Sequence, residues 1–144
     1  MIIGIGTVCF IIDRVLKYLA LDGTTFGPVD GGIRFEFFQN SAIAFSISFP
    51  KALSLAVIPV VCLVFVYFAV RLYRARDLMR SSLLIVAVMG AASNYFDRLQ
   101  HGFVVDYVSL GNWLPVFNLG DVMIIVPLVL LLLPVRHRSA LKPM

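Results

Sequence analysis

The sequence predicts a mainly α-helical membrane protein with four transmembrane helices. The chain of 144 residues is 60% hydrophobic and only 14% charged, with a mean hydropathy of +0.96. A soluble domain of this size cannot bury so much apolar surface and still keep a polar exterior. Stretches apolar and long enough to cross a bilayer occupy residues of about 1–21, 52–70, 81–100 and 118–135.

Basic residues follow the second and fourth of these stretches and predict the orientation of a single membrane domain. The segment Arg71–Arg80 has four Arg against one Asp, a net charge of +3, and the tail at 136–142 is also basic. Since cytoplasmic loops are enriched in Lys and Arg, both termini are expected in the cytoplasm. The segments at about 22–51 and 101–117 then lie together on the extracytoplasmic side. The apolar N-terminus lacks a basic leader and a cleavage site, so we expect it to be a retained span.

Two charged side chains lie near the outer end of the first span. Asp13 and Lys17 are four residues apart, with the acid first, so they share a helix face as a favourable pair. The pattern is typical of an interfacial ion pair that anchors a helix end, with Lys17 extending to water. A role in a functional site is the alternative.

The first outer segment predicts turns and a strand. Several glycines together with Pro28 mark turns near its start. Residues 33–37 alternate apolar and polar side chains, which is the period of a half-buried strand. The stretch at 40–49 is too polar to span, and it either continues the strand or forms a short helix in the membrane interface. Loops of this length with structure of their own are usually functional.

The third span is predicted to carry polar residues at its outer end, because about 20 residues are needed to cross the hydrocarbon. Asn94, Asp97 and Arg98 then lie at i, i+3 and i+4, so they form one polar stripe that faces the protein interior. The small residues at 90–93 allow another helix to approach closely.

The last outer segment and the fourth span hold two further carboxylates. Residues 103–109 are short and β-prone, and they include Asp106. Asp121 falls in the first turn of the fourth helix, where the positive end of the helix dipole favours a carboxylate. An aromatic belt at the membrane interface is predicted from Tyr107, Trp113 and Phe117.

Several kinds of site are disfavoured by the residues present. Cys9 and Cys62 lie inside apolar spans without the spacing of a metal site or a disulfide framework, so we interpret them as packing residues. His101 has no serine-hydrolase context, and motifs for zinc or nucleotide binding are absent from the sequence. The position of the basic residues beside apolar spans argues for a membrane and against nucleic acid.

Hydrolysis by a pair of carboxyl groups is the chemistry that the residues still allow. Of two close carboxyl groups one keeps a proton, and such a pair hydrolyses an amide by activating water and protonating the carbonyl. Asp106 and Asp121 fit this role because each lies at the outer interface with short connections between them. Asp97, which directly precedes Arg98, fits a structural ion pair better.

The polar residues fall in five short motifs, namely Asp13-Arg-Val-Leu-Lys17, Asn40-Ser-Ala-Ile-Ala-Phe45, Asn94-Tyr-Phe-Asp97-Arg98, Val104-Val-Asp106 and Phe117-Asn118-Leu-Gly-Asp121. These motifs resemble those of the bacterial lipoprotein signal peptidases, the signal peptidase II family of intramembrane aspartyl peptidases. Any one motif is weakly specific. Five in order, at family-like separations across nearly the whole chain, form a specific signal.

The resemblance implies a fold, a substrate and a site. Asp106 and Asp121 would form the catalytic dyad, supported by Asp13, Lys17, Asn40, Asn94, Asp97, Arg98 and Asn118. The substrate would be a prolipoprotein whose cysteine carries diacylglycerol, cut just before that cysteine at the outer face of the bacterial inner membrane. The segment at about 22–51 would form a β-cradle and a small interfacial helix. We expect a monomer in contact with lipids, without metal or other cofactor.

Small-residue positions depart from the family pattern. Ala42-Ile43 stands where the family usually has Gly-Ala, Ser93 where it has Gly, and Gly120 where it has Ala. Since the polar residues are kept, an active enzyme is the favoured interpretation. The alternatives are an inactive relative that binds lipoproteins, and a small transporter that uses intramembrane carboxylates as a relay. The lack of a midplane charge or an inverted repeat argues against the transporter.

Overall fold

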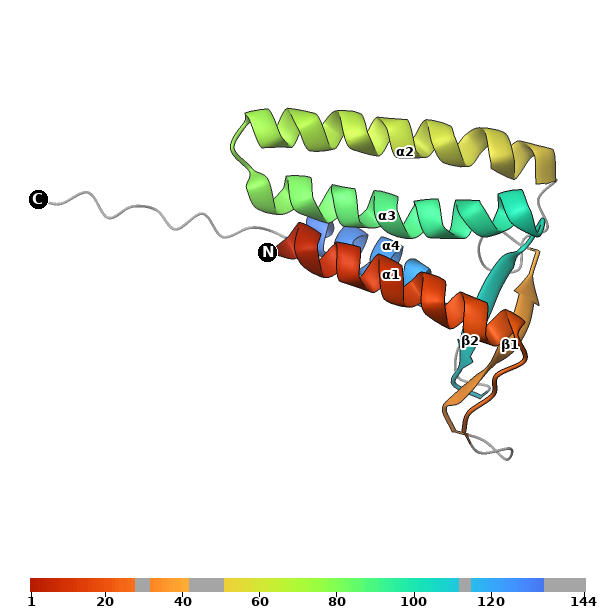
Figure 1. Cartoon of the computed structure of the whole chain (residues 1–144). Coiled ribbons are helices and arrows are strands. Elements are labelled where there is room, and N and C mark those ends of the chain that lie inside the picture. The colour runs from red at the N-terminus through yellow and green to blue at the C-terminus, as the bar shows by residue number, and fades with distance from the viewer. Residues whose placement is uncertain (28–31, 42–50, 112–114, 134–144) are drawn as a thin grey trace, which may run out of the picture.

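The computed structural model describes residues 1–27, 32–41, 51–111 and 115–133. Its elements in chain order are α1 (Ile2–Leu21), β1 (Arg34–Asn40), α2 (Lys51–Arg74), α3 (Leu78–Gln100), β2 (Val104–Ser109) and α4 (Leu119–Leu132). The helices lie side by side, and the two antiparallel strands lie at one end of them (Figure 1). The protein is therefore mainly helical with a small sheet, as predicted.

Helices occupy the four stretches in which spans are predicted, and α2 and α3 are longer than predicted at the ends where they are joined. α2 continues through Arg71 and Arg74, which lie in its last turn, and α3 begins at Leu78. The basic segment is thus mostly helical, and the chain reverses within three residues at 75–77. Asp77 caps α3 because its side chain accepts a hydrogen bond of 3.1 Å from the Arg80 amide.

The length and composition of the described helices distinguish α2 from the rest. Within the described residues, Ala52–Arg74 is the one helix long and apolar enough to cross a membrane by these measures. α4 is apolar but its described part is shorter. α1 and α3 carry charged residues that reduce their hydropathy, and most of these charges are buried between the helices.

Burial of polar and apolar side chains is inverted relative to a soluble protein. The buried polar residues include Asp13, Lys17, Asn94, Asp97, Arg98, Asp106 and Asn118. Large apolar side chains are instead exposed along the helices, among them Ile5, Val8, Ile11, Leu63, Tyr67, Ile125 and Val129. An apolar exterior around a polar interior is suited to lipid surroundings, because lipid solvates the exterior and the polar groups satisfy one another.

α3 is the central element, in contact with α1, α2, α4 and β2. Its closest approach to α4 is at Gly90, where an added Cβ would overlap the backbone oxygen of Gly120 and lie 2.8 Å from the Cβ of Met123. The prediction that small residues allow close packing here is confirmed. This contact holds the first turn of α4 against the polar stripe of α3.

A β-bulge sets which side chains of β1 face Asp106. Phe35 pairs with Val108, but Phe38 pairs with Asp106, so β1 contains one extra residue between them. Without the bulge, alternation would place Gln39 on the Asp106 face; with it, Asn40 lies there as a diagonal neighbour. The strand at 33–37 was predicted, but its simple alternation is wrong beyond the bulge, and Phe37 is exposed.

Candidate active site

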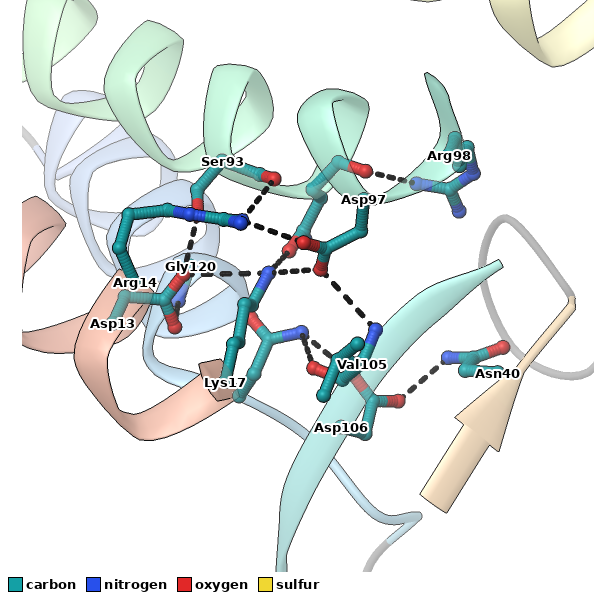
Figure 2. A network of polar contacts seen from close by, with 12 residues as sticks. Asp13, Arg14, Lys17, Asn40, Ser93, Asp97, Arg98, Val105, Asp106 and Gly120 are labelled. Atoms are coloured by element: carbon teal, nitrogen blue, oxygen red, sulfur yellow. Dashed lines mark hydrogen bonds and ion pairs between the residues drawn. The ribbon is translucent and has the colours of Figure 1, made fainter. Parts of the chain in front are cut away.

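Lys17 of α1 is completely buried and lies at the centre of a polar network (Figure 2). Its ammonium nitrogen lies 2.6 Å from Asn94 Oδ1, 2.7 Å from Asp97 Oδ2 and 3.3 Å from Asp13 Oδ2. Three acceptors match the three N–H groups of an ammonium. The predicted pair with Asp13 is present, but the interfacial anchor with Lys17 extending to water is wrong, because a full set of acceptors replaces water inside the protein.

Asp97 joins three elements through its two oxygens. Oδ1 accepts from Arg14 at 2.5 Å, whereas Oδ2 accepts from Lys17 and, at 3.2 Å, from the amide of Val105. The structural ion pair predicted for Asp97 is therefore formed with cations of α1, although the sequence pointed to the adjacent Arg98. The bond to Val105 holds β2 against α3 immediately before Asp106.

The burial of Asn94, Asp97 and Arg98 confirms the predicted interior stripe on α3. Gly102 ends this helix with a φ of +84°, and its amide donates to the Arg98 carbonyl at 3.1 Å. A glycine takes this left-handed conformation at little cost. The chain can therefore reverse directly into β2 and bring Asp106 back toward the stripe.

Asp106 lies in β2 with only 1% of its surface exposed. Its Oδ1 accepts from Asn118 Nδ2 at 2.6 Å, and its Oδ2 accepts from Asn40 Nδ2 at 2.7 Å. Burial raises the pKa of Asp106 to about 6, helped by the nearby negative charge of Asp121 and opposed by the two amide donors and Lys17. A carboxyl group in this state exchanges a proton near neutral pH.

Asp121 and Asn118 form a capping box at the start of α4. Asn118 Oδ1 accepts from the Asp121 amide at 2.9 Å, and Asp121 Oδ2 accepts from the Asn118 amide at 3.2 Å. The other oxygen of Asp121 accepts from Asn94 Nδ2 at 2.7 Å. Since the Asn118 side chain also donates to Asp106, this one residue contacts both carboxyl groups, Asp106 through its side chain and Asp121 through its backbone amide.

Arg98 lies 6% exposed on α3 and donates to the Asn94 carbonyl at 3.5 Å. Its guanidinium is close enough to interact electrostatically with Asp121, Asp106 and Asp97. The structure thus brings together all nine residues predicted for the site, namely Asp13, Lys17, Asn40, Asn94, Asp97, Arg98, Asp106, Asn118 and Asp121.

Sequence reasoning missed three side chains of this network. Arg14 binds Asp97 and the Ser93 carbonyl, the latter at 3.2 Å, and its guanidinium lies over the Phe96 ring. Ser93 donates to Asp13 Oδ2 at 2.5 Å. Tyr107, predicted in an interfacial belt, is instead buried and donates to Asp13 Oδ1 at 2.8 Å. Alternation along a strand would place Tyr107 on the face opposite to Asp106, so spacing gave no signal for its bond to Asp13.

A cavity of about 350 Å³ lies beside Arg14, between the C-terminal ends of α1 and α3. Its lining consists of Arg14, Tyr18, Leu21, Asp22, Gln100 and His101. Asp106 and Asp121 do not line it, so it is separate from the linked carboxyl groups. Among the described residues, groups of three or more His, Cys, Asp or Glu able to hold a metal ion are absent.

Four predictions concern residues outside the described part of the chain. They are the short interfacial helix, the effect of Ile43, the interfacial position of Trp113, and the cytoplasmic tail at 136–142.

Comparison with known proteins identifies the family. The family model for signal peptidase (SPase) II matches residues 5–136. A lipoprotein signal peptidase of Microcystis aeruginosa is 33% identical over 94% of this chain and 92% of its own, and one of Actinobacillus succinogenes is 31% identical over 90% and 85%.

Solved structures share the fold. A bacterial membrane enzyme determined by the in meso method at 2.3 Å resolution matches with a TM-score of 0.77 and 23% identity, covering 90% of this chain and 84% of that one. A second, at 1.9 Å resolution, matches with a TM-score of 0.69 and 21% identity, covering 90% and 88%. The family-model match over residues 5–136 and the two lipoprotein signal peptidases show that the chain belongs to the signal peptidase II family.

Proposed function

We propose that the chain is an aspartic endopeptidase that removes signal peptides from lipoprotein precursors, with Asp106 and Asp121 as its catalytic residues. One observation carries the catalytic assignment. Among the described residues, the network holds four carboxyl groups and three cations, namely Asp13, Asp97, Asp106 and Asp121 with Arg14, Lys17 and Arg98. One proton on a carboxyl group makes this charge balance, and buried charge favours balance.

The proton belongs to the pair of Asp106 and Asp121. Asp97 contacts both Lys17 and Arg14, and Asp13 pairs with Lys17, so both are compensated directly. Asp106 is hydrogen-bonded to neutral amides and has a pKa raised to about 6 by burial and by Asp121. We therefore assign the proton to Asp106 and the negative charge to Asp121.

Asp121 is suited to act as the base. It accepts from Asn94, whose oxygen binds the Lys17 ammonium, and it lies in the first turn of α4, where the helix dipole favours a negative charge. Asp121 and Asn40 are partly exposed, whereas Asp106 is buried. The substrate carbonyl and the water would therefore approach from the side of Asp121 and Asn40.

In the proposed reaction, water attacks the carbonyl carbon of the scissile peptide bond. Asp121 takes a proton from the water while Asp106 donates its proton to the carbonyl oxygen. As the tetrahedral intermediate collapses, the C–N bond breaks, the leaving nitrogen takes the proton from Asp121, and Asp106 recovers a proton from the hydroxyl. The pair returns to its starting state without a covalent intermediate.

The substrate is a precursor whose cysteine carries diacylglycerol, and cleavage falls just before that cysteine. This proposal rests on family membership and on the place of the carboxyl groups, with Asp106 in β2 and Asp121 in the first turn of α4. The two strands lie at one end of the helices (Figure 1). A lipid-bearing cysteine is held at the membrane interface, so a peptidase acting on it needs its carboxyl groups near that depth. We propose a monomer in contact with lipids that does not bind nucleic acid.

We further propose that all four helices cross the inner membrane. At 1.5 Å per residue, the 20 residues of α1 extend about 30 Å and the 23 residues of α3 about 35 Å, which matches the hydrocarbon thickness. Arg71, Arg74 and Arg80 lie at the end opposite to the sheet, which supports a cytoplasmic location for that end. The termini would then be cytoplasmic, and the sheet extracytoplasmic.

The direct test uses the purified full chain and a diacylglyceryl-modified prolipoprotein, with release of the signal peptide followed by gel mobility. We expect cleavage by the wild type, and none by Asp106→Asn or Asp121→Asn. The matched control is Asp22→Asn, the same substitution at an exposed acid at the end of α1, which should cleave like the wild type. Cleavage that survives in both dyad variants would exclude this assignment. Substrate bound but left intact by the wild type would identify an inactive relative.

A further inference from the structure

The first turn of α4 is held by side chains from two other elements. A helix begins with N–H groups that lack partners within the helix. Here the amides of Asn118 and Asp121 are satisfied within the capping box. The Leu119 amide donates to Tyr107 Oη at 2.9 Å, and the Gly120 amide donates to Asp13 Oδ1 at 3.0 Å. β2 and α1 therefore complete the cap of the helix that carries Asp121.

Tyr107 connects the two contacts that α4 makes with other elements, at the Leu119 and Gly120 amides. Its hydroxyl group accepts from the Leu119 amide and donates to Asp13 Oδ1, which is the same oxygen that binds Gly120. With 1% of its surface exposed, the hydroxyl has no access to water that could replace these bonds. Burial and the negative charge of Asp13 raise the pKa of Tyr107, so it keeps the proton that it donates.

Ser93 fixes Asp13 from the opposite side. Its hydroxyl donates to Asp13 Oδ2 at 2.5 Å, and Lys17 contacts the same oxygen at 3.3 Å (Figure 2). Each oxygen of Asp13 is thus held by a different group of donors, Oδ1 by Tyr107 and Gly120, and Oδ2 by Ser93 and Lys17. A carboxylate held in this way has one orientation, and it can fix the position of a helix start.

We propose that Tyr107 is a positioning residue for the peptidase reaction, and that together with Asp13 and Ser93 it clamps the first turn of α4 so that Asp121 faces Asp106. The three residues form the α4 clamp. Tyr107 acts through Leu119 and Asp13, and it does not contact the substrate. The kinetic test of this inference rests on the proposed function, because it measures cleavage. The hydrogen-exchange test does not depend on that function.

The kinetic test compares Tyr107→Phe with Tyr95→Phe in the full chain. Tyr95 makes a hydroxyl bond of 3.4 Å to the Leu55 carbonyl, between α3 and α2, so the control loses one hydroxyl outside the clamp. We expect kcat of Tyr107→Phe to fall roughly 10- to 100-fold, because small displacements of reacting groups are costly. KM should stay within about twofold, since the substrate does not touch Tyr107. Tyr95→Phe should keep both constants.

The pH profile separates positioning from general loss of stability. The charge of Asp121 contributes to the raised pKa of Asp106, so a displaced Asp121 lowers that pKa. The alkaline limb of the pH profile of kcat/KM for Tyr107→Phe should therefore move to lower pH, whereas a merely less stable enzyme keeps the wild-type profile. Wild-type kcat and profile in Tyr107→Phe would overturn the inference. Failure of the wild type to cleave would instead concern the proposed function.

Hydrogen exchange of the amides at 118–122 tests the clamp without catalysis. Tyr107→Phe should exchange these amides at least tenfold faster than the wild type, because the Leu119 amide loses its acceptor. Ser93→Ala, which leaves Tyr107 in place, should show the same change to a smaller degree. Tyr95→Phe should match the wild type. Unchanged exchange in both clamp variants would overturn the inference, even if Tyr107→Phe proved unstable.

Discussion

The ammonium nitrogen of Lys17 lies 2.6 Å from the side-chain oxygen of Asn94, 77 positions along the chain. The amide nitrogen of the same Asn94 donates to Asp121 at 2.7 Å. The positive charge therefore polarises an amide whose other end binds a carboxylate, and hydrogen bonds in such a chain strengthen one another. Lys17 acts on Asp121 through Asn94 and does not need to touch it.

Replacement of Lys17 by Met should abolish cleavage and destabilise the fold. Asp13 and Asp97 would lose their shared cation inside the protein, and removal of one partner from a buried pair costs about 3–5 kcal/mol. Thermal unfolding in detergent measures this loss. The control is Arg34→Gln, which breaks the partly exposed pair with Glu36 and should cost at most about 1 kcal/mol. Equal unfolding temperatures for the two variants would contradict the central role of Lys17.

Asn118→Ala should separate capping from catalysis when compared with Asp77→Ala. Each substitution removes a helix cap, at about 1 kcal/mol, one from α4 and one from α3. Asn118 alone also links Asp106 to Asp121. We therefore expect lost cleavage in Asn118→Ala and near wild-type cleavage in Asp77→Ala. The unfolding temperature should fall further in Asn118→Ala, because this buried side chain also donates to Asp106 and to the Val105 carbonyl. Equal activities would show that the link has no catalytic role.

The rate of cleavage should fall as the pH rises above about 6. Asp106 holds its proton below a pKa of about 6, and above it both catalytic carboxyls are charged, so the acid is lost. The dependence of kcat/KM on pH measures this limb, because it reports the pKa values of the free enzyme. A rate that stays constant from pH 6 to pH 9 would contradict the assignment of Asp106 as the acid.

The raised pKa of Asp106 also predicts that the stability of the fold depends on pH. The folded protein favours protonated Asp106, whereas the unfolded chain ionises it near pH 4. The resulting stabilisation is complete below about pH 4 and is lost as the pH rises to about 6, on the order of 3 kcal/mol. Unfolding temperatures of the wild type and Asp106→Asn should therefore diverge across this window. Parallel curves would show that Asp106 ionises normally.

Gly90→Ala should weaken both the fold and the reaction. The added Cβ would overlap the Gly120 backbone oxygen, so α3 and α4 must move apart, at a cost of about 1–3 kcal/mol. Asn94 is one helical turn from Gly90, so its bond to Asp121 should lengthen and cleavage should slow. Gly4→Ala is the control, because a Cβ there meets nothing within 4 Å. Its expected effect is neutral or slightly stabilising.

Local patterns in the sequence predicted the four helices and the two strands, and the structure brings the nine residues predicted for the site into one network. Apolar lengths located the helices, and the i, i+3, i+4 spacing of Asn94, Asp97 and Arg98 gave their common face. Asp121 was correctly placed in a first helical turn. These features are local, and spacing along one element is enough to reveal them.

The partners of the charged residues were not predictable in the same way. Asp97 was expected beside its neighbour Arg98, but its cations come from α1, since a helix contact joins residues 80 or more positions apart. Lys17 was expected at the interface because its chain position says nothing about the acceptors that another helix supplies. The bulge in β1 arises from pairing with β2, so alternation within β1 alone could not show that Asn40 lies on the same face as Asp106.

The capping of α4 by Tyr107 and Asp13 has a consequence for biosynthesis. The ribosome makes α4 last, so α1, α3 and β2 exist before the segment that carries Asn118 and Asp121. Until that helix docks, Asp106 has neither its partner carboxylate nor the amide that links them. Under the proposed mechanism, the nascent chain therefore lacks hydrolytic activity while it is being inserted, and activity begins only when α4 has docked.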